Sequence, residues 1–108
     1  YFDALHDMGD PIGALRHARA SLAPGGTVVA VEPFAGDALE DNLHAVGLTW
    51  YASSTLVCVP NSLAQPGAAA LGAQAGPERL FATFREAGFA HVRVAASTPF
   101  NLVIEARG

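Results

Sequence analysis

The sequence predicts an α/β fold, and two patterns in its 108 residues carry that prediction. One is a helix and a turn followed by Thr27–Val31, a continuous apolar run typical of a strand buried on both faces of a parallel sheet. The other is a pair of strand-like stretches, His91–Ala95 and Asn101–Ala106, joined by a short turn. Such a pair closes as a hairpin, so one strand must run antiparallel to the rest. We therefore expect a partial Rossmann-like sheet with helices on both faces and a closing antiparallel hairpin.

The first eleven residues read as the end of a buried strand near Asp3, a short polar turn, and the start of a helix. Asp10 is a favourable N-cap, and Pro11 suits the first helical position, where no N–H is needed. The turn thus follows the carboxyl end of a strand, where ligands bind in open α/β sheets. Because no strand precedes this one, we expect the chain to be a piece of a larger protein.

The helix expected over Asp10–Leu22 and the strand Thr27–Val31 form the second half of a βαβ crossover. Consecutive strands of such a unit lie side by side and parallel. The strand that ends near Asp3 should therefore neighbour Thr27–Val31. This places His6 and Glu32, which each follow one of these strands, on the same edge of the sheet.

The second half of the chain is less regular. A helix is expected over Leu39–Cys58, with Pro60 ending it. Ser62–Gly76 is interpreted as a loop that can contain a helical turn, and Gly67–Gly76 within it is rich in Ala and Gly, the composition of flexible or compositionally biased filler. A further helix begins at Pro77 and ends at Gly88, which is a favourable C-cap.

Composition excludes several function classes. The formal charge is −4, all six basic residues are arginines, and they form no long cluster, so nucleic acid and anionic membranes are poor partners. No apolar run approaches the roughly 20 residues of a membrane span. The single cysteine, Cys58, excludes an internal disulfide and a cysteine-based zinc site, and suits the cytoplasm. His17, His44 and His91 show no metal-ligand spacing, so we expect no metal site.

Four motifs, in this order, resemble a known family. They are F-D-A-L-H-D near the start, L-x-P-G-G after the first helix, V-V-A-V-E-P, and A-G-F at the end of the last helix. Together they resemble the C-terminal half of a class I S-adenosylmethionine-dependent methyltransferase, from the end of its fourth strand to its closing hairpin. The glycine-rich loop and the ribose-holding acid of that family belong to the N-terminal half, which this chain lacks.

A closer resemblance is to small-molecule O-methyltransferases of the plant caffeate type. Their signature is similar to the segment His6–Asp10, although Trp is more usual at Met8 and Ser at Gly9. This resemblance implies that His6 is the general base that takes a proton from the acceptor hydroxyl. It also implies that two carboxylates, Glu32 and Glu78, hold this histidine or the substrate.

The resemblance carries further implications. The cofactor would be S-adenosylmethionine, beside the backbone of Phe2, Asp3 and Ala4, and the partner would be a small-molecule acceptor with Trp50 and Tyr51 walling its pocket. A full-length homodimer, joined through a preceding winged-helix domain, is expected, and the isolated chain should be inactive.

Simpler interpretations stay open at each position. His6 can be a packed turn residue, Glu32 a cap on the sheet edge, and Glu78 a carboxylate favoured by the dipole of its helix. The chain can then belong to a non-catalytic or regulatory relative that binds a ligand or serves dimerisation. A dehydrogenase half is a weaker alternative, because the closing hairpin and the Glu32-Pro33 ending argue against it.

Overall fold

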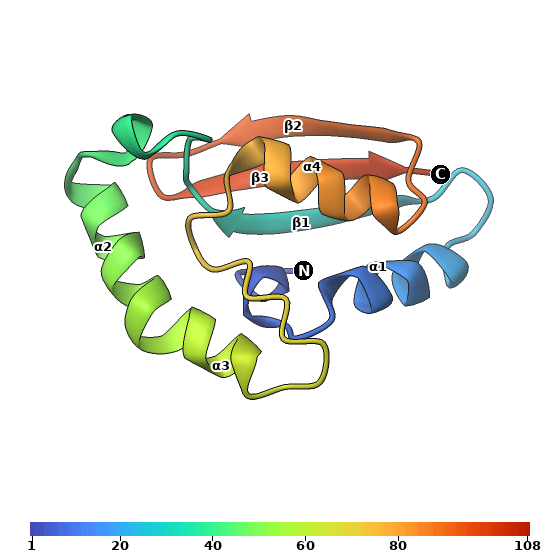
Figure 1. Cartoon of the computed structure of the whole chain (residues 1–108). Helices are drawn as coiled ribbons and strands as arrows, with labels where there is room; N and C mark the ends of the chain where they lie inside the picture. Colours follow the sequence, from blue (N-terminus) through green and yellow to red (C-terminus); the bar gives the residue numbers. More distant parts are fainter.

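The computed structural model describes all residues from 1 to 108 (Figure 1). Three strands form one sheet: β1 (Thr27–Pro33), β2 (His91–Ser97) and β3 (Asn101–Arg107). The α-helices are α1 (Pro11–Ala20), α2 (Ala45–Ser53), α3 (Val59–Leu63) and α4 (Gly76–Glu86). Two 3₁₀ turns, η1 (Leu5–Asp7) and η2 (Leu39–Asn42), and a π-helical turn, η3 (Ser54–Cys58), complete the chain.

The strand order is β1-β3-β2, and β3 runs antiparallel to both neighbours. This confirms the closing hairpin, and its last strand, β3, lies between β1 and β2. The expected strand near Asp3 is much shorter than predicted, since only Phe2 forms a parallel bridge, to Val31. Two backbone bonds fix it: Asp3 N donates to Val31 O at 2.7 Å, and Val31 N donates to Tyr1 O at 2.9 Å.

Helices α1 and α4 cover the same face of the sheet, so the expectation of helices on both faces is wrong for this chain. Alternate residues of β1 and β3 are buried in a core shared with α1 and α4, which comprises Leu15, Val28, Ala30, Leu80, Phe84, Leu102, Ile104 and Ala106. On the opposite face Val29 is 45% exposed. The chain therefore forms two layers rather than three.

The helix starts follow local capping chemistry. Gly13 N donates to Asp10 Oδ1 at 2.8 Å, which confirms Asp10 as the N-cap of α1.

The expected Leu39–Cys58 helix is instead divided into η2, α2 and η3. Pro60 does not end it, because the π-helical turn before it already interrupts the regular hydrogen-bond ladder, and the chain continues through Pro60 as α3. None of the helices is long and apolar enough to cross a bilayer.

Candidate functional site

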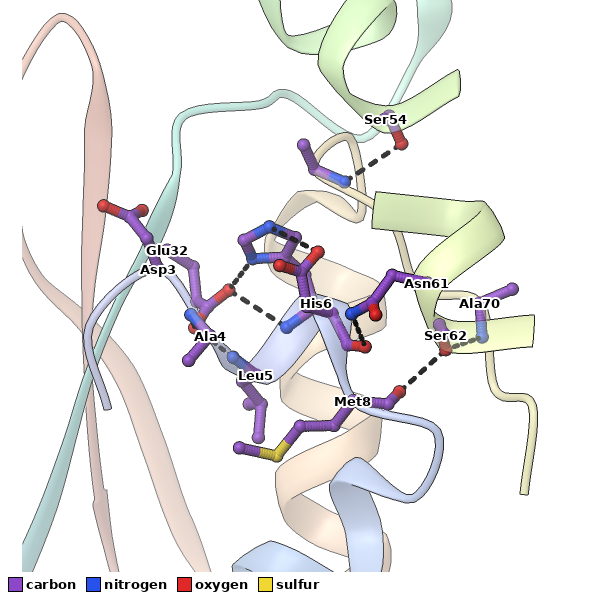
Figure 2. A network of polar contacts seen from close by, with 12 residues as sticks. Asp3, Ala4, Leu5, His6, Met8, Glu32, Ser54, Asn61, Ser62 and Ala70 are labelled. Carbon is purple, nitrogen blue, oxygen red and sulfur yellow. Dashed lines mark hydrogen bonds and ion pairs between the residues drawn. The ribbon is translucent and has the colours of Figure 1, made fainter. Parts of the chain in front are cut away.

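The carboxylate of Glu32 organises the turn that follows the N-terminal segment. Glu32 is the second-last residue of β1 and is 1% exposed. Its Oε1 accepts hydrogen bonds from Leu5 N at 2.9 Å and Ala4 N at 3.4 Å, and its Oε2 accepts one from His6 N at 3.2 Å (Figure 2). A buried carboxylate needs such donors. The end of β1 therefore fixes the backbone of the turn.

The same carboxylate holds the His6 ring. Nδ1 of His6 lies 2.5 Å from Oε2 of Glu32, and the histidine is 5% exposed. Burial by itself lowers the pKa of His6, but the hydrogen bond to Glu32 and the charges of Glu32, Asp7 and Asp3 outweigh it, so the pKa is raised above its ordinary value. The pairing expected from the sequence between His6 and Glu32 is present.

Asp7 lies beside the other ring nitrogen. Its Oδ1 is 3.3 Å from His6 Nε2, but without hydrogen-bond geometry, so this buried oxygen has no hydrogen-bond partner. The histidine thus sits between two carboxylates, those of Glu32 and Asp7. Asp7 has the place beside His6 that the resemblance gave to Glu78, and its position next to His6 in the sequence was the signal for it.

The π-helical turn brings Cys58 into this group. Donor atoms of His6, Asp7 and Cys58 all lie within 4.8 Å of one another, and Cys58 is 6% exposed. Burial and the neighbouring Asp7 carboxylate raise the pKa of the Cys58 thiol to about 11. A π-turn inserts one extra residue into a helix and is frequent at functional sites. Nothing in the sequence spacing indicated that Cys58 would reach the turn.

The α3 helix and the loop after it hold the turn from the other side. Ser62 Oγ donates to Met8 O at 2.8 Å (Figure 2), and Gln65 Nε2 donates to Asp7 O at 3.0 Å. Backbone packs on backbone at Gly67, whose φ is +96° and where an added Cβ would meet Gly9 O at 2.5 Å. The Ala- and Gly-rich segment, interpreted from composition as filler, is therefore part of the support of His6.

Glu78 lies apart from His6 and Glu32. It is exposed in the first turn of α4, and its backbone N–H donates to Asp37 Oδ1 at 2.7 Å. Its carboxylate makes no hydrogen bond or ion pair; instead it lines a cavity with Asp37, Gln74, Ala75 and Arg79. The expected trio of His6, Glu32 and Glu78 is therefore reduced to the first two in this structure.

The residues expected beside a cofactor lie at the carboxyl end of the sheet. Phe2 is 80% exposed, and Asp3 has a φ of 46°, a strained value for a residue other than glycine. Asn101 Nδ2 donates to Asp3 Oδ1 at 2.9 Å, which ties this end to β3. Neither His6 nor Trp50 lines any of the three cavities of the chain, so the expected acceptor pocket is not formed by these residues alone.

No protein-family model and no curated protein matches the sequence. The solved structures do contain a similar fold. PigF with SAH superimposes with a TM-score of 0.69 at 20% sequence identity. The match covers 99% of this chain but only 29% of that one.

The chain shares the fold of part of PigF. At this identity the likeness concerns the fold, and it agrees with the methyltransferase-like order of motifs in the sequence. The finer caffeate-type resemblance stays a prediction.

Proposed function

We propose that this chain is the C-terminal part of the catalytic domain of an S-adenosylmethionine-dependent methyltransferase. Support comes from the fold shared with PigF, whose solved structure carries SAH. SAH is the compound that S-adenosylmethionine becomes once it has given up its methyl group. The open strand end at Phe2 and Asp3, with its strained backbone, fits a place beside that cofactor.

The proposed reaction is methyl transfer to a hydroxyl of a small molecule, and the observation that carries it is the buried His6–Glu32 pair. With Nδ1 held by Glu32, the Nε2 lone pair of His6 takes the proton of the acceptor hydroxyl. S-adenosylmethionine, when bound, would supply the methyl group, and its carbon–sulfur bond would break as the acceptor oxygen forms the new bond to carbon. The proton stays on His6 as an imidazolium ion.

Two carboxylates stabilise that imidazolium. Glu32 accepts from Nδ1, and Asp7 Oδ1, 3.3 Å from Nε2 and otherwise unpartnered, interacts with the newly protonated nitrogen. Opposite charges this close favour the protonated ring strongly inside a protein. In this proposal Asp7 replaces Glu78 as the second carboxylate of the site.

One observation favours a second candidate, a non-catalytic methyltransferase-fold protein that binds a ligand or serves dimerisation. Both nitrogens of His6 already face carboxylates, and the ring is 5% exposed. A histidine that only holds a turn together has these surroundings as well.

The test is single-turnover methyl transfer by the full-length protein, with S-adenosylmethionine binding measured separately by calorimetry. We expect His6→Ala to lower the rate by ~10²–10⁴-fold, the usual weight of general acid–base catalysis, with cofactor affinity unchanged. His17→Ala, at an exposed histidine on α1, is the matched control. A His6→Ala protein that keeps its rate, or that loses cofactor binding instead, would favour the non-catalytic candidate.

A further inference from the structure

Three side chains with different donor atoms lie close together at the η1 turn: the imidazole of His6, the carboxylate of Asp7 and the thiol of Cys58. One ligand atom from each lies within 4.8 Å of the other two. His6 and Cys58 are buried, whereas the Asp7 side chain is 32% exposed and leaves a route from solvent. The first two residues come from η1, and the third is the last residue of the π-helical turn η3.

Nitrogen, oxygen and sulfur donors together suit a borderline cation of the zinc type rather than magnesium or calcium, which prefer oxygen alone. Two independent features point to a ligand at this place. Asp7 Oδ1 is buried beside the other donors with no hydrogen-bond partner. His6 already presents Nε2 to the group, because its Nδ1 is held by Glu32 at 2.5 Å. A carboxylate behind a histidine in this way is the usual support of a zinc ligand.

We propose that His6, Asp7 and Cys58 bind one zinc-like divalent cation, and that the bound ion switches off the methyl-transfer site. The ion is bonded to Nε2 of His6, Sγ of Cys58 and a carboxylate oxygen of Asp7, with water in the fourth position. The Nε2 lone pair that accepts the acceptor proton is then occupied. Cation binding stands on the geometry alone, whereas the inhibition rests on the proposed function.

Cation binding needs a small movement of the side chains and the loss of the protons on the ligand atoms. Zinc bonds of about 2.0–2.3 Å separate neighbouring ligand atoms by roughly 3.5 Å, so the side chains must close by about 1 Å. Cys58 gives up its thiol proton to solvent as the sulfur–metal bond forms, and a protonated His6 also gives up its Nε2 proton, so at least one proton is released per ion bound.

Cation binding is tested on the full-length protein with Co²⁺ as a coloured probe and Zn²⁺ as competitor. We expect a thiolate-to-cobalt absorption band that Zn²⁺ abolishes and that Cys58→Ser lacks. Glu32→Gln should weaken zinc binding by about 10–100-fold, as loss of a supporting carboxylate does. His17→Gln, at an exposed histidine, should leave it unchanged. As a check that needs no variant, Zn²⁺ should protect Cys58 of the wild type from alkylation, read by peptide mapping.

The second measurement is the methyl-transfer rate with and without Zn²⁺, expressed for each protein as a ratio to its own zinc-free rate. We expect strong inhibition of the wild type and weaker inhibition of Cys58→Ser. Absence of the cobalt band together with unprotected Cys58 would overturn the cation site and leave the base role of His6 standing. Zinc bound at Cys58 without any loss of rate would keep the site and overturn the inhibition, and with it the base role of His6.

Discussion

Nδ1 of His6 lies 2.5 Å from Oε2 of Glu32, although 26 positions separate the two residues in the chain. The contact exists because the N-terminal segment runs parallel to the end of β1, where Phe2 bridges Val31. Glu32 then meets both the backbone and the ring of the turn. One carboxylate therefore shapes the turn and orients its histidine.

Replacing that carboxylate should affect stability and rate together. Glu32→Gln puts an amide NH₂ where an oxygen now accepts hydrogen bonds, so a buried donor faces the N–H of Leu5 or of His6. We expect the free energy of unfolding to fall by about 1–3 kcal/mol. We expect methyl transfer to slow less than in His6→Ala. Urea denaturation and single-turnover kinetics measure the two effects. Glu40→Gln, at an exposed site, is the control, and equal stability of Glu32→Gln and wild type would contradict the prediction.

The raised pKa of His6 predicts a pH dependence with a definite sign. Because the pKa is higher in the folded state than the ordinary 6.5, the stabilisation is fully present below pH 6.5 and is lost as the pH rises through the folded-state pKa. The stability advantage of the wild type over His6→Gln should therefore shrink as the pH rises above 6.5. Chemical denaturation at a series of pH values measures it. An advantage that grows with pH would show that the pKa is lowered.

The methyl-transfer rate should also depend on the protonation of His6, but it should rise with pH, whereas the stabilisation falls. Only the neutral imidazole accepts a proton, so the methyl-transfer rate should rise with pH and level off above an inflection higher than 6.5. Asp7→Asn removes one of the charges that raise the pKa, and should move the inflection to lower pH. A pH–rate profile of the wild type and of this variant measures the shift. An inflection that stays fixed would exclude the influence of Asp7.

Substitution of Asp10, the N-cap of α1, should change the stability of the protein without altering the candidate site. Asp10→Ala removes the acceptor of the Gly13 N–H, and should lower the free energy of unfolding by about 0.5–2 kcal/mol. Asp10→Asn keeps an acceptor oxygen and should recover most of the loss. The rate per folded molecule should not change in either protein, and a slower Asp10→Asn enzyme would tie this cap to the site.

An apolar surface on the α2–α3 region predicts self-association. No Asp, Glu, Lys or Arg lies between residues 42 and 77, and Leu56 and Val57 are 77% and 58% exposed. We expect the 108-residue chain to associate with increasing concentration, and the double change Leu56→Glu with Val57→Glu to reduce this association. Analytical ultracentrifugation measures it, with Phe100→Glu, at an exposed site in the β2–β3 turn, as the control. A wild-type chain that stays monomeric would contradict the prediction.

The strand pattern and the capping residues predicted the parts of the fold that depend on residues close to one another in the sequence. The Thr27–Val31 run, the closing hairpin and the Asp10 cap are all present. The pairing of His6 with Glu32 followed from the crossover rule, because two parallel strands end at the same edge. These features needed only local preferences and one topological rule.

The rest of the fold and of the candidate site depends on contacts between residues far apart in the sequence, which no local pattern encodes. Thr27–Val31 is apolar throughout, which suggested cover on both faces, but Val29 stays 45% exposed on the face opposite the helices. Glu78 follows a helix start, where a carboxylate is favoured by the dipole, so its position carried little information about the site. Cys58 reaches Asp7 only because a π-helical turn shifts the helix, and that turn has no clear sequence signal.

The close packing of Gly67 on Gly9 has a consequence for how this protein can diverge and be engineered. Surface loops usually accept insertions, tags and length variation, and low-complexity segments accept them most readily. Here the low-complexity stretch packs directly against the turn that carries His6, since a Cβ at Gly9 or at Gly67 would collide with the backbone of the facing segment. Inserting or deleting a residue in it would disrupt its contacts with Gly9 and with the backbone oxygen of His6, although Glu32 would still hold the turn to β1. We expect circular permutation or domain insertion at this stretch to lower the proposed methyl transfer while the sheet and its core stay folded.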